Sequence, residues 1–157
     1  MAPREEFMVM AFEVALRGIE SGAGGPFGAV VVRGDDVLAT GHNQVVGTND
    51  PTAHAEVGAI RAACASLRSF QLDGCDLYAS CEPCPMCLGA IYWARPRAVF
   101  FSATREDAAQ AGFDDAFIYE EMALPREART LPLRRVEHPR AGDPFAAWAA
   151  KPDRVEY

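Results

Sequence analysis

Two cysteines at a short spacing after a proline constrain this chain more than any other feature of its 157 residues. Cys84 and Cys87 stand three positions apart directly after Pro83, and proline is favoured at the first position of an α-helix. If a helix begins near Pro83, both thiols fall on one face of its first turn. Because thiolates at this spacing are preferred ligands of Zn²⁺, the segment predicts a metal site.

A third metal ligand and a proton carrier stand earlier in the chain, at His54 and Glu56. One imidazole with two thiolates leaves the fourth tetrahedral position of zinc open, and water held there has its pKa lowered to roughly 7. On a continuous helix, the His54 and Glu56 side chains would point roughly 200° apart. They can therefore serve one site only if that site lies beyond the N-terminal end of the helix. We therefore expect a helix capped at Asp50 or Thr52, with both residues in its first turn.

The alternative to a catalytic zinc is a structural one, which requires four protein ligands. Cys81, His42 or a distant group could supply the fourth ligand, and metal loss on replacing Cys81 or His42 would indicate such a site. We expect Cys81 to be buried at the end of a strand. His42 should face away from Asn43, because neighbouring residues of a strand point to opposite sides. Glu56 beside the ligands favours the catalytic interpretation.

The pattern of apolar residues predicts an α/β fold. Helical periodicity or capping signals indicate helices at 4–21, from 50 or 52 to about 69, and at 83–94, 104–111, 114–122 and 144–150. Apolar, partly β-branched runs indicate strands at 27–32, 37–43, 76–80 and 98–102, with 47–51 as a loop and 131–137 as a strand or an arm. Alternation of strands and helices in the middle of the chain predicts a sheet with helices on both faces.

Composition narrows the class of partner. The length suits one domain, and the net charge of −7 disfavours a nucleic-acid partner, because neutralising phosphates needs a basic surface. The longest uncharged apolar run, 88–94, is too short to span a membrane, and the charged N-terminus does not read as a signal peptide. Five cysteines, an odd number, favour free thiols and a metal in a reducing cytosol. We therefore expect a cytoplasmic protein that acts on a small molecule.

The motifs described above resemble those of a known enzyme family. His54-Ala55-Glu56 followed by Pro83-Cys84-Pro85-Met86-Cys87 matches the H-x-E…P-C-x-x-C signature of zinc nucleobase deaminases. Nearly the whole chain resembles bacterial guanine deaminases of the cytidine deaminase fold. The further segments that carry this resemblance are 25–29, 43, 49–52, 88–93, 112–115 and 157.

The resemblance implies a three-layer α/β/α fold with a central mixed sheet of about five strands. It implies a single deaminase domain over 1–157, with a catalytic body at about 1–124 and an arm, helix and lid at 125–157. In relatives this C-terminal segment is exchanged between two subunits, so we expect a homodimer, which the apolar 88–93 helix also favours. The lid would leave little room for a ribose on the base.

The activity implied is hydrolytic deamination of guanine to xanthine and ammonia, with one zinc per chain. The residues implied are the ligands His54, Cys84 and Cys87, the catalytic Glu56 and Asp115, and the substrate contacts Phe27, Asn43, the Ala55 backbone N–H, Trp93 and Tyr157. Phe27 and Trp93 could instead be plain core. Asp114 and Asp115 could simply begin a helix, where carboxylates are favoured.

Other activities stay open at this stage. Within the superfamily they are deamination of guanosine, or of another aminated ring such as ammeline or cytosine. A tRNA adenosine deaminase relative would bind RNA, against which the acidic composition counts. A structural zinc module is the alternative that is not an enzyme.

Overall fold

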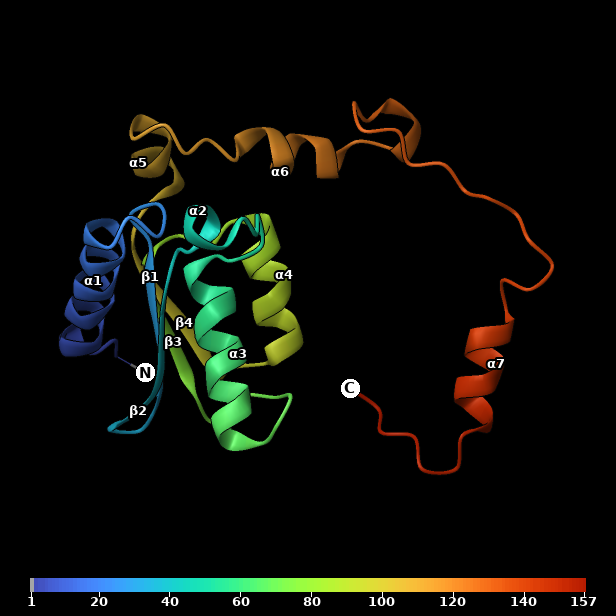
Figure 1. Ribbon diagram of the computed structural model, residues 1–157, viewed down its shortest axis with the longest axis horizontal. Helices are drawn as coiled ribbons and strands as arrows, with labels where there is room; N and C mark the ends of the chain where they lie inside the picture. Colours follow the sequence, from blue (N-terminus) through green and yellow to red (C-terminus); the bar gives the residue numbers. More distant parts are fainter. Residues whose placement is uncertain (1) are drawn as a thin grey trace. The chain divides into compact units, whose positions relative to one another are not determined.

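A four-stranded mixed sheet organises the first of two units into which the chain divides (Figure 1). The computed structural model describes residues 2–157; the first unit ends at Tyr119 and the second is Glu120–Tyr157. The strands are β1 (Gly28–Arg33), β2 (Asp36–His42), β3 (Asp76–Cys81) and β4 (Ala98–Ala103), in the order β2-β1-β3-β4. β1 is antiparallel to β2 and β3, whereas β3 and β4 are parallel.

Helices cover both faces of this sheet because successive residues of its central strands point to opposite sides. Helix α1 (Glu5–Glu20) lies on one face, and α3 (Ala55–Leu67) and α4 (Pro85–Ala94) lie on the other (Figure 1). The core under α1 is formed by Phe7, Ala11, Val30, Val32 and Tyr78. The core on the other face includes Ala29, Val31, Leu77 and Ala79 from the strands, with Ala59, Ile60, Ile91 and Ala94 from the helices. The predicted three-layer α/β/α arrangement is confirmed.

The expected number of about five strands is wrong by one. The structure gives four strands among residues 2–157, and 131–137 forms neither strand nor helix. Its apolar side chains are exposed, as at Leu131 and Val136, and Pro132 cannot donate a backbone hydrogen bond to a strand ladder. The remaining helices are α2 (Val45–Thr48), α5 (Arg105–Gln110), α6 (Ala116–Ala123), the 3₁₀ turn Arg126–Ala128 and α7 (Asp143–Ala150). None of the helices in the described part of the chain is long and apolar enough to cross a membrane.

Helices α3 and α4, which carry the candidate site residues, begin later than predicted. The cap of α3 is His54, in an extended conformation with φ −75° and ψ 157°, and not Asp50 or Thr52. The Asp50 carboxylate instead accepts hydrogen bonds from the backbone N–H and the hydroxyl of Thr52, at 2.8 and 2.7 Å, which closes a local turn. Similarly, α4 begins at Pro85 with Cys84 as its cap, rather than at Pro83.

Close backbone approach fixes where α1 and α3 lie on the sheet. A methyl group added at Gly41 of β2 would meet the backbone oxygen of Ala55 and lie 2.7 Å from the backbone nitrogen of Ala59. A methyl group at Gly28 of β1 would clash in the same way with the backbone of α1. Because only glycine allows this separation, Gly41 sets the position of the first turn of α3.

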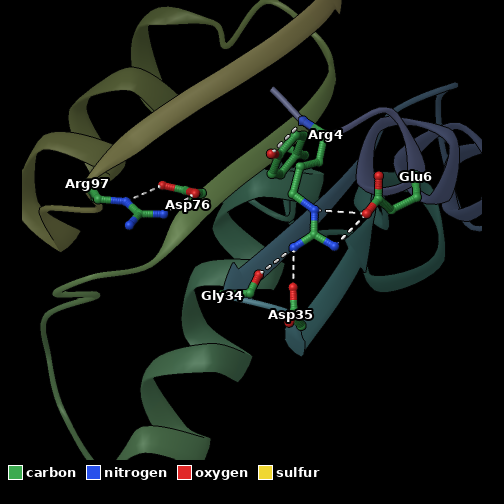
Figure 2. Close-up of polar contacts among 7 residues, drawn as sticks. Arg4, Glu6, Gly34, Asp35, Asp76 and Arg97 are labelled. Carbon is green, nitrogen blue, oxygen red and sulfur yellow. Dashed lines mark hydrogen bonds and ion pairs between the residues drawn. The ribbon is translucent and has the colours of Figure 1, made fainter. Parts of the chain in front are cut away.

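Charged contacts join segments at the other end of the sheet (Figure 2). Arg97 donates two hydrogen bonds to the buried carboxylate of Asp76, at 2.9 and 2.5 Å. Arg4 pairs with Glu6 and Asp35 and donates to the carbonyl of Gly34 at 3.2 Å. Asp76 is the first residue of β3, whereas Cys81, the last, lines the cavity described below. These contacts therefore fasten the sheet without taking part in the site.

Candidate metal centre

His54, Cys84 and Cys87 bring three metal-ligating atoms together at the N-termini of α3 and α4. All three atoms lie within 4.8 Å of one another. His54 Nδ1 is 3.6 Å from Cys84 Sγ and 3.5 Å from Cys87 Sγ. The extended backbone at His54 directs its side chain off the helix end, which is how it and Glu56 reach the same site.

Local structure favours thiolate at this position. The Cys84 sulfur caps α4 by accepting the backbone N–H of Cys87 at 3.5 Å, and a helix N-terminus stabilises negative charge. Hydrogen bonds from the Cys87 thiol, from His54 and from the Cys87 N–H lower the pKa of Cys84 to about 4. The hydrogen bond to Cys84, together with burial, raises the pKa of Cys87. Without a metal, these shifts favour thiolate at Cys84 and a protonated thiol at Cys87.

The donor set fits zinc in chemistry and in spacing. Two soft sulfurs and an imidazole nitrogen are ligands that zinc prefers. Zn–S and Zn–N bonds of roughly 2.3 and 2.0 Å at a tetrahedral angle hold sulfur and nitrogen about 3.5 Å apart. The distances of 3.6 and 3.5 Å between His54 Nδ1 and the two sulfurs match this value.

Within residues 2–157, the group of mutually close ligands contains only these three, so Cys81 and His42 do not complete a structural site. The Cys81 thiol donates to the carbonyl of Thr104 at 3.4 Å, and burial raises its pKa to about 11. His42 packs on the other side, where a methyl group added at Gly18 of α1 would lie 2.9 Å from its Cβ. A three-residue donor set leaves a fourth position open, as in catalytic zinc sites.

A cavity of about 390 Å³ opens beside the three ligands. Of the residues predicted for the site, its walls include Phe27, Asn43, His54, Glu56, Cys84 and Asp115. The sequence thus identified much of this wall before the fold was available.

Two carboxyl groups of the cavity share an environment that favours protonation. Glu56 lies in the first turn of α3 with only 7% of its surface exposed, and burial is the main cause that raises its pKa. Partial burial raises the pKa of Asp115, and the negative charge of Cys84 adds to the effect. Asp114 has a different role, because its carboxylate accepts the backbone N–H of Ala116 at 2.9 Å at the start of α6.

Asn43 is held in one orientation. Its side-chain oxygen accepts the backbone N–H groups of Gly25 and Val45, both at 3.2 Å, and the residue is buried. With the oxygen engaged, the amide NH₂ is the part that can bind a ligand. Phe27 stands nearby in an edge-to-face pair with Phe113, with ring centroids 5.0 Å apart.

Three residues predicted to contact the substrate are not among those that line this cavity. Trp93 lies on α4 with 64% of its surface exposed. Ala55 is the buried first residue of α3. Tyr157 belongs to the second unit, which is described by itself. The substrate contacts of these residues stay predictions.

Sequence reasoning missed several residues of the cavity wall. Phe113 belongs to a segment that carried the resemblance, yet no role was assigned to it. Glu82 lies inside the cysteine motif, between Cys81 and Pro83, and no role was predicted for it from the sequence. Arg105 offered no signal, because only the fold brings the start of α5 to the cavity.

Comparison with known proteins gives consistent matches. Residues 1–103 match the family model described as the cytidine and deoxycytidylate deaminase zinc-binding region. The chain is 55% identical to guanine deaminase of Bacillus subtilis (strain 168) over 153 residues, which is 98% of each protein. The X-ray structure of guanine deaminase from Bacillus subtilis superposes with a TM-score of 0.96 at 54% identity, covering 99% of both chains. The tRNA-specific adenosine deaminase of Aquifex aeolicus is 42% identical over 100 residues, 64% of this chain and 66% of that protein.

Proposed function

Because the chain belongs to the cytidine and deoxycytidylate deaminase zinc-binding family, we propose that it hydrolyses guanine to xanthine and ammonia with one zinc ion. The observation that carries this proposal is the cavity itself, where Glu56 lies beside the His54, Cys84 and Cys87 ligands. The similarity to a guanine deaminase over the whole chain, against a tRNA deaminase over about two-thirds of it, supports guanine as the substrate.

His54, Cys84 and Cys87 would hold the zinc ion, which when bound supplies a water molecule acidified to a pKa of roughly 7. Glu56 accepts the proton of the water that attacks C2 of guanine, and returns it to a ring nitrogen. Burial of Glu56 suits this task, because a carboxyl with a raised pKa holds the transferred proton more readily. The C2–N bond then breaks as the proton of the hydroxyl group now on C2 passes to the amino group, which leaves as ammonia while Asp115 hydrogen-bonds it and C2 becomes the carbonyl carbon of xanthine.

The base is held by contacts along the opposite wall. Phe27, fixed edge-to-face by Phe113, offers an apolar surface on which a flat ring can pack. The NH₂ of Asn43 donates to an acceptor atom on the edge of the base. The backbone N–H of Ala55 lies in the first turn of α3, where backbone donors have no partner within the helix, and binds another acceptor of the ring.

The assembly and compartment belong to the same proposal. We place the whole chain in one deaminase domain, with a catalytic body at about 1–124 and a C-terminal arm, helix and lid at 125–157. The protein acts in the cytoplasm as a homodimer whose C-terminal segments are exchanged. Exposed apolar side chains on α4, at Leu88, Tyr92 and Trp93, support an interface between subunits. Tyr157 and its carboxylate would close over the base.

The test is a substrate panel with the full-length chain loaded with zinc. Ammonia release is measured with guanine, guanosine, adenine, cytosine, cytidine, ammeline and a tRNA anticodon stem-loop. We expect guanine to give the highest kcat/KM, with xanthine as product and one zinc per chain. Cys84→Ser should lose both the zinc and the activity, because two remaining ligands hold zinc poorly.

Two results would reject the proposal. Full activity in a preparation shown by atomic emission to lack zinc would exclude the metal mechanism. A higher kcat/KM for the RNA or for guanosine than for guanine would reject the substrate while leaving the deaminase family intact.

A further inference from the structure

Four residues beside the cavity contact one another in a closed ring, which we call the Tyr119 bridge: Glu82, Pro83, Arg105 and Tyr119. The backbone N–H of Arg105 donates to Glu82 Oε2 at 3.2 Å. The Arg105 guanidinium carbon lies 5.0 Å from the centre of the Tyr119 ring, within cation–π range. The Tyr119 hydroxyl donates to the carbonyl oxygen of Pro83 at 3.3 Å, which closes the ring.

The bridge joins the two segments that carry the reacting groups. Pro83 directly precedes the metal ligand Cys84. Tyr119 lies one helical turn after Asp115, whose carbonyl accepts the backbone N–H of Ile118 at 2.9 Å. A contact between Tyr119 and Pro83 therefore sets how far Asp115 lies from the ligand cluster.

Apolar packing does not fix this distance. Neither α5 nor α6 contains a buried residue, so few contacts hold the segment between them. On one side of Asp115, Phe113 packs on Phe27. On the other side, the Tyr119 bridge attaches the chain to Pro83 in the segment 81–87, which we call the metal loop. A segment held by so few contacts opens easily when one of them is lost.

We infer that Tyr119 is a positioning residue for deamination, which holds Asp115 at its working distance from the His54, Cys84 and Cys87 cluster. The inference rests on the proposed function in one respect, the action of Asp115 on the leaving amino group. The expected cost of releasing Asp115 is large, because a displacement of about 1 Å at a reacting group can lower the rate about 10²-fold.

The test variant is Tyr119→Phe, which removes the hydroxyl and keeps the ring for Arg105. Its matched control is Tyr78→Phe, since the buried Tyr78 hydroxyl also makes one bond to the backbone, accepting the Arg4 N–H at 3.1 Å, but lies outside the cavity. We expect Tyr119→Phe to lower kcat for guanine about 10- to 100-fold with little change in KM, the pattern of a loss confined to the transition state. Tyr78→Phe should keep the kcat of the unmodified protein.

A double variant shows whether Tyr119 acts through Asp115. If it does, Tyr119→Phe combined with Asp115→Asn should be no slower than Asp115→Asn alone, because the two changes remove one interaction. Losses that multiply in the double variant would overturn the inference. So would a Tyr119→Phe protein with unchanged kcat.

Two measurements on the same variants do not depend on turnover. The absorption spectrum of the Co²⁺-substituted protein should be the same with and without the Tyr119 hydroxyl, because the ligands are unchanged; an altered spectrum would assign Tyr119 to the metal loop instead. Hydrogen exchange in residues 112–119 should be faster in Tyr119→Phe and unchanged in Tyr78→Phe.

If the unmodified protein does not deaminate guanine, the proposed function fails, while unchanged exchange in this segment would separately reject the bridge. Should Tyr119→Phe fold poorly, Arg105→Ala, which alters an exposed residue, removes the cation–π contact of the same bridge and should show the same faster exchange.

Discussion

At the scale of single residues, Glu56 shows how burial prepares a side chain for chemistry. The residue is 93% buried among the metal ligands, and burial makes its charged form less favourable, which raises its pKa. The Cys84 thiolate raises the pKa further, whereas His54 lowers it. A buried carboxyl next to an acidified water can accept a proton and give it back within one reaction cycle.

The first residue-scale prediction concerns Glu56→Gln. The amide keeps the shape of the side chain but cannot carry the proton, so the rate of guanine deamination should fall about 10²–10⁴-fold. Zinc content should stay at one per chain, because Glu56 is not among the three clustered ligands. Ammonia release and metal analysis on the same preparation check both statements, with Glu20→Gln, at the exposed end of α1, as the control. Loss of zinc from Glu56→Gln would show that the residue is a ligand.

The sequence could predict residues whose chemistry is distinctive at a fixed spacing. His54, Cys84 and Cys87 were identifiable because few residue types bind zinc and their spacing is tightly restricted. Arg105 and Tyr119 were not, since arginine and tyrosine are common surface residues and their roles depend on which segments the fold brings together.

At the scale of elements, two helices begin at the metal site. The caps of α3 and α4 are His54 and Cys84, so two of the three ligands are the residues at which a helix starts. The N-terminal end of a helix carries partial positive charge, which stabilises thiolate, and the Cys87 N–H of α4 already donates to the Cys84 sulfur. The position of α3 in turn depends on Gly41, on which its first turn rests.

Gly41→Ala should therefore disturb the site by displacing the first turn of α3. The added methyl group would push away the backbone of Ala55 and Ala59. We expect a loss of about 1–3 kcal/mol in the free energy of unfolding, as for other overpacked positions. Guanine turnover should fall as well, because the first turn of α3 carries Glu56. Urea denaturation and ammonia release measure the two effects.

Gly58→Ala is the matched control within the same helix. Nothing lies within 4 Å of a methyl group added at Gly58, and alanine is the better helix former. This variant should gain up to about 1 kcal/mol in the free energy of unfolding. Equal stability of the two variants would show that β2 does not position α3.

Errors at this scale have local causes. The helix start was placed too early because Asp50 is a favoured cap, but its carboxylate is engaged by Thr52 in a preceding turn. Alternating apolar residues in 131–137 resembled a strand, yet strand formation requires a partner edge, which the sequence of the segment does not reveal. The central strands and helices were predictable because their apolar periodicity matches the faces that they bury.

At the scale of the whole molecule, the last helix of the second unit carries exposed apolar side chains. Phe145 on α7 is 78% exposed and Trp148 on the same helix is 43% exposed. Exposed aromatic side chains of this kind are typical of surfaces that pack against another protein. This observation supports the proposed exchange of C-terminal segments in a homodimer, and sedimentation analysis would measure the oligomeric state.

The last prediction is that the final residues, 154–157, are needed for turnover but not for the metal. All three ligands belong to the first unit, so deleting these residues should leave one zinc per chain and the same denaturation curve. Guanine turnover should fall at least about 10²-fold, because a closed lid excludes water and holds the base in its reactive position. The same lid should make guanosine a poor substrate of the full-length chain, since it would leave little room for a ribose. Tyr157→Ala serves as the control that separates the ring from the terminal carboxylate. An undiminished rate after truncation, or a preference for guanosine in the full-length protein, would contradict the lid and with it the choice of guanine.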